Sequence, residues 1–359
     1  MYEWRNQNDK SAASEGGIIM PQSNINLMRA KKQKKDEFYT RLEDIENELQ
    51  YYRHHFEGKV VYCNCDDPYE SNFFKYFAMR FNSLKLKELI ATSYKYSMIR
   101  GAESDVENKP SAIRITRLED LNDDGAEDLL DIKESIANGE IEGSEIDLII
   151  DGDFRSPECV DLLQEADIVV TNPPFSLFRE YLAQLIEHDK KFLILGNQNA
   201  ITYKEVFPLI KEEVIWLGVH SNKVLNFRIP SSYEYFSYEE GGEKYARVPA
   251  INWFTNLDNR MSKPDLLLYK KYDPEYHLRY DNYDAINVDK VVDIPLDYDG
   301  VMGVPITYVQ RHDPDQFEIV GLSEQCGRGF SGSLWRGGAS HPLVRGKKKY
   351  SRLFIRRIT

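Results

Sequence analysis

The run Asn172-Pro173-Pro174-Phe175 stands where a β-branched stretch, residues 167–171, gives way to a helical pattern. Two consecutive prolines cannot continue a central strand, because neither donates a ladder hydrogen bond. The prolines also fix φ, so the direction of the Pro173 carbonyl is set before a substrate arrives. The tetrapeptide therefore holds a carboxamide, a carbonyl and an aromatic ring on a stiff turn.

The chemistry that suits this turn is the activation of an amino group. Such a group on a heteroaromatic ring is a poor nucleophile, because its lone pair is delocalised. The Asn172 side-chain oxygen and the Pro173 carbonyl can each accept one N–H and localise the lone pair on nitrogen, while Phe175 can stack on the ring. An activated methyl group then transfers by positioning and electrostatics alone. The motif indicates amino-group methylation from S-adenosylmethionine, against the alternative of a strand that simply ends in a Pro-Pro turn.

The composition of the 359 residues excludes several classes of protein. No apolar run approaches the roughly 20 residues of a membrane span, and the N-terminal stretch lacks the apolar segment of a signal peptide. The four cysteines, at positions 63, 65, 159 and 326, form no CxxC pair and no cluster with zinc-ligand spacing. We expect a cytoplasmic protein (in the bacterial nucleoid or a phage-infected cell) with reduced thiols, no metal and no membrane contact.

The net charge of −13 is unevenly distributed. Residues 328–359 contain nine Arg or Lys and no acidic residue, and a second basic run, residues 29–35, follows a polar N-terminal arm. Positive patches on an acidic body are typical of a phosphate-binding surface, although a solvated tail has the same composition.

Strands and helices alternate from residue 59 to residue 219. The patterns predict strands over 59–65, 87–96, 146–151, 167–171, 190–197 and 214–219, and helices over 36–56, 70–84, 157–166, 176–189 and 203–213. This alternation is typical of βαβ units and predicts an α/β fold with a mostly parallel, twisted sheet flanked by helices. Ligands bind beyond the carboxyl ends of such strands, so the Asn-Pro-Pro-Phe turn lies on the functional edge. After residue 255 only short strand signals remain, at 308–312 and 317–322.

Other polar residues lie where a cofactor pocket is expected. The segment 63–74 follows the first strand of the series; its acidic residues can hold an ammonium, and Asn72 or the helix start can meet a carboxylate. Thr40 precedes that strand and can bind the same carboxylate. Asp153 can accept from an adenine amino group while Phe154 stacks on the ring, or Asp153 can simply cap the helix that follows.

The stretches DEFYT, CNCDDP, SNFFKYF, DGDFRS, ADIVVTNPPFSLFREY, NAITYKEVFPLI and GVPITY resemble the EcoRI-type adenine-specific DNA methyltransferases. The similarity runs from about Asp36 to Leu322. It implies a Rossmann-like class I fold that uses S-adenosylmethionine, with the turn as the catalytic motif for N6 of adenine: Asn172, Pro173, Pro174 and Phe175. It also implies a set of cofactor-binding residues: Tyr39, Thr40, Cys65, Asp66, Asp67, Pro68, Asn72, Asp153, Phe154 and Asn172.

Two features depart from the usual methyltransferase pattern. The glycine-rich first cofactor loop is replaced by CDDPYES, which has no glycine, and strand 87–94 ends without the acidic residue that commonly holds the ribose. The order of the motifs predicts a flexible basic arm over 1–35 and a catalytic domain over 36–258. A smaller DNA target-recognition region with a basic tail follows over 259–359.

The expected substrate is double-stranded DNA. Reaching both N–H groups of an adenine requires flipping the base out, at a cost of a few kcal/mol. Phe227 and Tyr233 can line the flipped-base pocket or serve as core aromatics of the sheet edge, and the basic C-terminal stretch can contact phosphates. The resemblance raises GAATTC as a candidate site. We expect a monomer that acts alone or beside a cognate restriction endonuclease without a stable complex.

Rival readings use the same residues. The Asn-Pro-Pro-Phe turn also suits methylation of guanine N2 in ribosomal RNA or of a glutamine amide in protein. A DNA-binding module with a decayed methyltransferase fold is opposed by the intact Asn172 and Phe175, and a fused nuclease by the chain length. Residues 120–131 fit a calcium-loop template, but the strand-like sequence before them and the lack of a partner hand favour an acidic loop.

Overall fold

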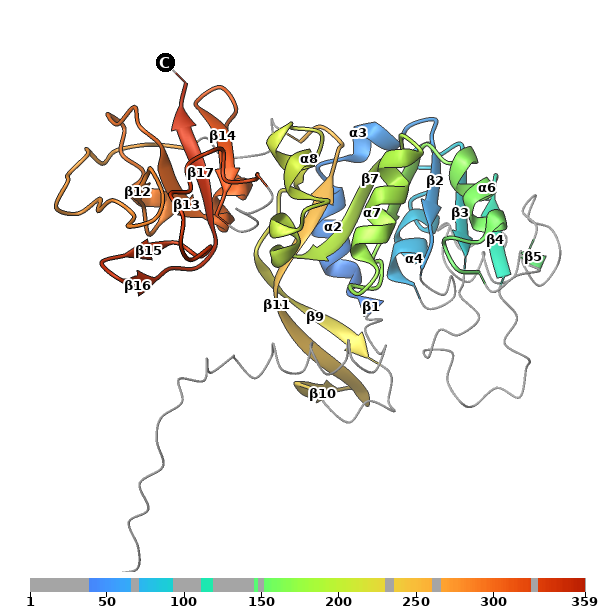
Figure 1. Ribbon diagram of the computed structural model, residues 1–359. Coiled ribbons are helices and arrows are strands. Elements are labelled where there is room, and N and C mark those ends of the chain that lie inside the picture. The colour runs from blue at the N-terminus through green and yellow to red at the C-terminus, as the bar shows by residue number, and fades with distance from the viewer. Residues whose placement is uncertain are drawn as a thin grey trace, which may run out of the picture.

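The computed structural model describes residues 39–65, 71–92, 111–118, 145–147, 152–229, 236–259, 266–323 and 329–358. Four neighbouring parallel strands form the centre of its main sheet (Figure 1). In spatial order they are β3 (Glu88–Thr92), β2 (Val60–Cys63), β6 (Ile168–Thr171) and β7 (Lys191–Asn197). These strands begin and end close to where the sequence predicts them.

Antiparallel strands extend the sheet on both sides. Beyond β3 lie β4 (Ser111–Ile115) and β5 (Glu145–Asp147), and beyond β7 lie β11 (Glu243–Thr255), β9 (Lys223–Ile229) and β1 (Tyr39–Thr40). Two shorter strands, β8 (Trp216–Leu217) and β10 (Tyr238–Glu240), pair with β11. The predicted α/β class is confirmed, but the sheet is mixed rather than mostly parallel. Parallel pairs need a crossover connection of a dozen or more residues, and from β8 to β11 the chain reverses through shorter connections instead.

Helices cover both faces of the sheet. They are α2 (Leu42–Leu49), α3 (Arg53–Phe56), α4 (Asn72–Ala78), α6 (Pro157–Glu165), α7 (Phe178–Glu187) and α8 (Phe207–Lys211), with the short 3₁₀ helix η1 (Gln198–Thr202). Successive side chains of a strand point to opposite faces. Accordingly, Val169 of β6 belongs to the hydrophobic cluster under α6 and α7, and its neighbour Val170 belongs to the cluster under α2 and α4.

The predicted helix over 36–56 is wrong at its start and in its middle. Tyr39 and Thr40 form β1, because a buried aromatic and a β-branched residue pair with β9 at the sheet edge. The helix is interrupted at Tyr52, whose φ and ψ are −115° and 4°. The Tyr52 hydroxyl donates to Glu48 Oε1 at 2.9 Å and accepts from Asn259 Nδ2 at 2.8 Å, and the contact with Asn259 is one that the local sequence pattern does not reveal.

A second, smaller lobe follows residue 266. Its four-stranded sheet has the order β12 (Ile286–Asn287), β13 (Met302–Pro305), β17 (Arg352–Arg357) and β14 (Phe317–Leu322), beside the hairpin β15 (Leu343–Val344) and β16 (Lys347–Lys348) and the 3₁₀ helices η3 (Val291–Asp293) and η4 (Ile306–Arg311). The predicted strand over 317–322 is confirmed, whereas the one predicted over 308–312 is wrong, because residues 308–311 belong to η4. The end of the basic stretch is an interior strand of this sheet rather than a free tail.

The two lobes share one hydrophobic core. A single cluster of buried residues contains Ile210 and Ile215 from the α8 region together with Val309 and Phe317 from the second lobe. Within the described residues, no helix is both long and apolar enough to cross a bilayer.

Candidate active site

The Asn-Pro-Pro-Phe turn lies at the carboxyl edge of the parallel strands. Thr171, the last residue of β6, is opposite Ile194 of β7, and Val169 is opposite Tyr62 of β2. Asn172 follows immediately and is only 6% exposed. The next residue is also buried, and the last two of the motif are half-buried. The strands therefore place the motif in a partly closed position at the edge where ligands bind.

The turn uses one of its two proline carbonyls and leaves the other available. The Pro174 carbonyl accepts from the Leu177 backbone N–H at 2.9 Å, which turns the chain into α7. Among the described residues, none donates a hydrogen bond to the Pro173 carbonyl. The Pro173 carbonyl and the Asn172 carboxamide oxygen together provide the two acceptors that amino-group activation requires.

A buried hydrogen-bonded lock ties the ends of β2 and β6 to α7. The Tyr181 hydroxyl donates to Asn64 Oδ1, and the Thr171 hydroxyl donates to the Asn64 carbonyl. All three residues are at most 3% exposed. Burial raises the pKa of Tyr181 well above its usual value, so the phenol stays a donor. This lock is not predictable from the sequence, because Tyr181 has the pattern of a core residue of a helix and Asn64 belongs to no recognisable motif.

Cys65 adopts the conformation that a glycine loop would supply. Its φ is +72°, in the left-handed region that is costly for residues with a Cβ. The glycine-free loop therefore keeps a glycine-like turn directly after β2. Asp66, Asp67 and Pro68, predicted to bind the cofactor, follow this turn and lie outside the described residues.

Two predicted cofactor residues from distant segments lie in contact. Asn72 Nδ2, at the start of α4, donates to the Thr40 carbonyl at 2.7 Å. Thr40 is opposite Phe227 in the sheet, and the Phe227 ring lies edge-on to Phe175 at 6.3 Å between centroids. Phe227 is fully buried, which favours its prediction as a core aromatic over its prediction as part of a flipped-base pocket. Tyr233 lies outside the described residues.

The Thr40 side chain offers a polar atom to a ligand. Its hydroxyl oxygen is buried and has no hydrogen-bond partner among the described residues. The neighbouring Tyr39 is buried beneath Arg228, whose guanidinium carbon lies 4.7 Å from the ring centroid. The Thr40 hydroxyl is therefore a candidate ligand-binding group, and the Tyr39 ring packs against Arg228.

Asp153 is held by an arginine rather than used as a helix cap. It accepts from Arg155 Nε at 2.8 Å, from a terminal guanidinium nitrogen at 2.7 Å and from the Arg155 backbone N–H at 2.9 Å. These hydrogen bonds lower the pKa of Asp153, which keeps it a carboxylate. The cap of α6 is Ser156, whose hydroxyl accepts from the Cys159 N–H. The alternative reading of Asp153 as a helix cap is wrong.

Phe154 packs against Tyr181, the tyrosine of the lock. Its ring is 6% exposed and lies edge-on to Tyr181, with centroids 5.1 Å apart. Gln184 Nε2 also donates to the Phe154 carbonyl at 3.1 Å. Tyr181 of α7 therefore makes two contacts. Its ring packs against Phe154, and its hydroxyl donates to Asn64.

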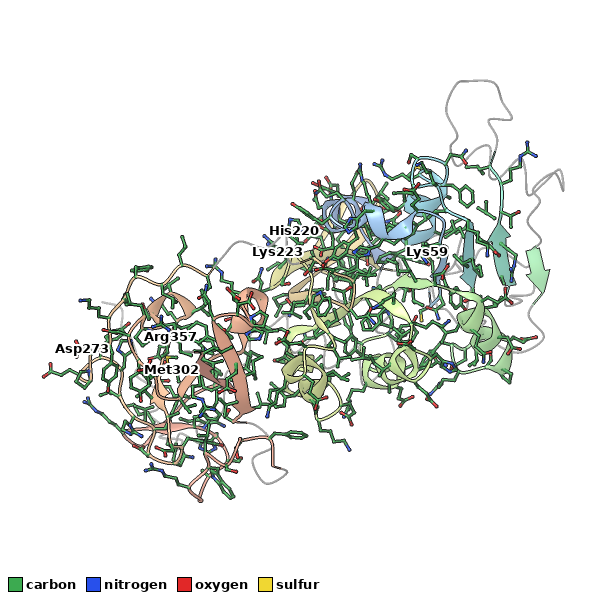
Figure 2. All side chains as sticks on the ribbon, turned by 90° about the horizontal axis from the view of Figure 1, so that it is seen from above. Lys59, His220, Lys223, Asp273, Met302 and Arg357 are labelled. Carbon is green, nitrogen blue, oxygen red and sulfur yellow. The ribbon has the colours of Figure 1, made fainter. Side chains whose placement is uncertain are left out.

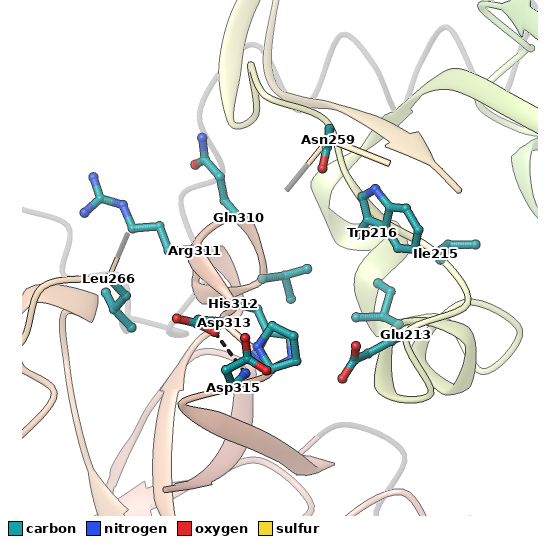
Figure 3. A pocket seen from close by; sticks show the side chains of 13 residues that line it. Glu213, Ile215, Trp216, Asn259, Leu266, Gln310, Arg311, His312, Asp313 and Asp315 are labelled. Carbon is teal, nitrogen blue, oxygen red and sulfur yellow. Dashed lines mark hydrogen bonds between the residues drawn. The ribbon is translucent and has the colours of Figure 1, made fainter. Parts of the chain in front are cut away.

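A cavity of about 220 Å³ lies between the lobes, away from the Asn-Pro-Pro-Phe turn (Figure 3). Trp216 and His312 are among its lining residues. Trp216 pairs with Thr255, which is opposite Leu193 near the start of β7, so the cavity lies toward the other end of the strands. In the described part of the chain, no group of three His, Cys, Asp or Glu is placed to hold a metal ion. The calcium-template segment, 120–131, lies outside that part.

The chain is similar to known proteins over most of its length. Residues 26–357 match the family model described as adenine-specific methyltransferase EcoRI. The chain is 51% identical to the type II methyltransferase M.EcoRI of Escherichia coli over 82% of this chain and 88% of that protein. It is 38% identical to M.MpnI of Mycoplasma pneumoniae and 35% identical to M.MgeORF184P of Mycoplasma genitalium, in each case over 81% of this chain and 84% of the relative. No solved structure matches significantly.

Proposed function

Because this chain belongs to the EcoRI family of adenine-specific methyltransferases and is a DNA methyltransferase, we propose that it methylates N6 of an adenine flipped out of duplex DNA (EC 2.1.1.72). The observation that carries the proposal is the pair of acceptors at the end of β6, the Asn172 carboxamide oxygen and the open Pro173 carbonyl. Flipping is required because an adenine stacked in a duplex cannot present both N–H groups and a ring face to this turn.

The acceptors raise the nucleophilicity of the adenine nitrogen. Hydrogen bonds from its two N–H groups to Asn172 Oδ1 and the Pro173 carbonyl draw the nitrogen toward a tetrahedral geometry. Phe175, half-buried against Phe227, offers the ring that fixes the base plane. The amine proton leaves after transfer, so the protein needs no strong base.

The residues around the end of β2 suit S-adenosylmethionine, which supplies the methyl group when bound. We assign its carboxylate to Thr40 and Asn72, since the buried Thr40 hydroxyl has no partner among the described residues and Asn72 contacts Thr40 directly. The ionised Asp153 is an acceptor for an adenine amino group, and the Cys65 turn brings backbone close to the ligand. Tyr39 and Phe154 support these residues by packing, and Asp66, Asp67 and Pro68 complete the assignment.

The architecture supports finer assignments. The parallel strands β3, β2, β6 and β7 correspond in our proposal to the cofactor-binding centre of a Rossmann-like class I methyltransferase. Residues 36–258 form the catalytic domain, 259–359 contribute to target recognition, and 1–35 form a basic arm. We propose a monomer in the bacterial cytoplasm that protects a site from a separate restriction endonuclease, with GAATTC as the first site to test.

Mass spectrometry of nucleosides tests the reaction. DNA from cells that express the chain should contain N6-methyladenine at a level well above that of cells with an empty vector. Ribosomal RNA and total protein from the same cells should show no new N2-methylguanine or methylglutamine. Methylated RNA or protein with unmethylated DNA would refute the assignment.

A further inference from the structure

Gly196, the last residue but one of β7, lies level with the Asn-Pro-Pro-Phe turn. β6 and β7 are parallel, and Thr171 at the end of β6 is opposite Ile194 of β7. Two residues further along each chain, Pro173 and Gly196 therefore stand at the same level. Gly196 is buried. It is a close neighbour of the carbonyl that we propose as an acceptor for the amino group.

The backbone conformation does not account for a glycine at this position. Gly196 belongs to a regular strand, and its φ lies outside the left-handed region that favours glycine. A glycine in the interior of a strand weakens that strand, and it often marks a place where another group approaches closely. The reason for Gly196 therefore lies in what surrounds it.

The group that approaches Gly196 is the ring of Phe178, the first residue of α7. Phe192 and Ile194 point from β7 into the cluster under α7, and Gly196 continues this row because successive residues alternate between faces. A Cβ atom on Gly196 would lie 2.5 Å from Phe178 Cε2 and 2.9 Å from Cζ. Carbon atoms in contact normally lie about 3.5–4.0 Å apart. The ring therefore occupies the space that any side chain at position 196 would need.

The Phe178 ring has little room to move aside. It is 2% exposed and lies against Phe254 of β11, with ring centroids 5.0 Å apart. Three residues later in α7, Tyr181 is fully buried and its hydroxyl donates to Asn64. Protein interiors are close-packed and leave few voids. A methyl group at position 196 would therefore displace the first turn of α7 together with the ring.

The first turn of α7 is attached directly to the Asn-Pro-Pro-Phe turn. Phe178 is only three residues after Phe175. Between them, the Leu177 N–H donates to the Pro174 carbonyl at 2.9 Å. Because each proline fixes φ, few backbone rotations remain that could absorb a displacement. A shift at the start of α7 would therefore move the Pro173 carbonyl and the Phe175 ring.

We propose that Gly196 is a positioning residue for methyl transfer: the close contact between its backbone and the Phe178 ring fixes the Asn-Pro-Pro-Phe turn relative to the sheet. The inference rests on the proposed function. Both acceptors of the turn must meet the two N–H groups of one nitrogen, and a misplacement of about 1 Å can cost about 10²-fold in rate. Gly196 thus acts through Phe178 without touching the substrate.

A double-mutant cycle tests the contact. Single-turnover rates of methyl transfer, at saturating DNA and S-adenosylmethionine, are measured for wild type, Gly196→Ala, Phe178→Leu and the double variant. Gly196→Ala should slow transfer about tenfold or more, with both dissociation constants within a few-fold of wild type. Leucine lacks the Cε2 and Cζ atoms that would meet the new methyl group, so the double variant should be faster than Gly196→Ala. Losses that simply add would overturn the proposal.

Hydrogen exchange at the Leu177 amide gives a readout that does not depend on activity. This N–H donates to the Pro174 carbonyl, so it should exchange faster in Gly196→Ala than in wild type. If Gly196→Ala does not fold, Phe178→Leu alone withdraws the ring from Gly196 and should both slow transfer and speed this exchange. No change in either quantity would overturn the proposal. A wild-type enzyme that leaves DNA unmethylated would refute the proposed function, and the exchange comparison would still test the contact.

The matched control is Gly218→Ala, which introduces a comparable clash elsewhere. A Cβ atom at position 218 would meet Glu48 and lie 2.6 Å from Trp253 Cβ. Gly218 is two residues before His220, which lies beside α2 on the side of the sheet away from α7 (Figure 2). This variant should be less stable, yet the folded enzyme should keep the wild-type rate and Leu177 exchange. Equal losses of rate in Gly218→Ala and Gly196→Ala would overturn the proposal.

Discussion

At the scale of single residues, substitutions at Cys65 test whether the loop after β2 contains a turn that favours glycine. At an ordinary position, glycine is less stable than alanine by about 0.5–1 kcal/mol, but a left-handed φ costs a residue with a Cβ about 1–2 kcal/mol. Since Cys65 has a φ of +72°, we expect Cys65→Gly to have a larger free energy of unfolding than Cys65→Ala in urea titrations. As a control, Ala78→Gly in α4 should lower the free energy of unfolding. If Cys65→Gly is also less stable than Cys65→Ala, Cys65 does not need a left-handed conformation.

Tyr181 joins α7 to the carboxyl edge of the parallel strands through its hydrogen bond to Asn64. Tyr181→Phe leaves the buried Asn64 Oδ1 without its donor, which should lower the free energy of unfolding by about 1–3 kcal/mol. It should also slow methyl transfer, because Thr171 and Asn172 lose their support. Urea unfolding and single-turnover assays measure both effects. The control Tyr350→Phe changes a side chain that is 91% exposed and should be neutral; equal behaviour of the two variants would argue against the lock.

The residues proposed as catalytic stand out in the sequence because their signal is local. Four adjacent residues, Asn172 to Phe175, combine an amide, two prolines that fix φ and an aromatic ring. The supporting residues carry no such signal. Asn64 and Tyr181 are separated by 117 positions and meet only through the packing of α7 on the sheet.

At the scale of elements, Glu48 connects α2 to the chain after β8. Its buried carboxylate accepts from the backbone N–H groups of Val219 and His220, both at 2.7 Å, and from the Tyr52 hydroxyl. Glu48→Ala leaves three donors without an acceptor, each costing about 1–3 kcal/mol. We expect a loss of at least about 3 kcal/mol in urea unfolding.

The exposed Glu43 on the same helix provides the comparison. Glu43→Ala should change the free energy of unfolding by less than about 0.5 kcal/mol. A loss at Glu48 as small as that at Glu43 would show that the carboxylate does not hold the two elements together.

The parallel strands could be predicted and the antiparallel pair of β9 and β11 could not. Buried β-branched runs alternating with helices mark β2, β6 and β7 directly. One side of the β9–β11 pair carries Arg, Asn and Tyr side chains, so its sequence resembles a loop with scattered aromatics. This pairing depends on tertiary contacts. For the same reason the sequence did not predict that the strands on both sides of the parallel centre are antiparallel.

At the scale of the whole molecule, the shared core predicts cooperative unfolding. Residues of α8 and of η4 and β14 lie in one hydrophobic cluster, so neither lobe buries its apolar surface alone. Differential scanning calorimetry should show one transition with equal calorimetric and van't Hoff enthalpies. Two resolved transitions, or a mutation such as Ile210→Ala that lowers only one of them, would show that the lobes fold independently.

The most direct measurement is the single-turnover rate of methyl transfer by Asn172→Ala on a duplex that the wild-type enzyme methylates, together with the affinity for that duplex. Removal of one preorganised hydrogen-bonding group from a transition state typically costs about 10²–10³ in rate. We expect a loss of at least that size, with DNA affinity within a few-fold of wild type. An Asn172→Ala enzyme that transfers methyl groups at a rate near that of the wild type would contradict the role of the turn.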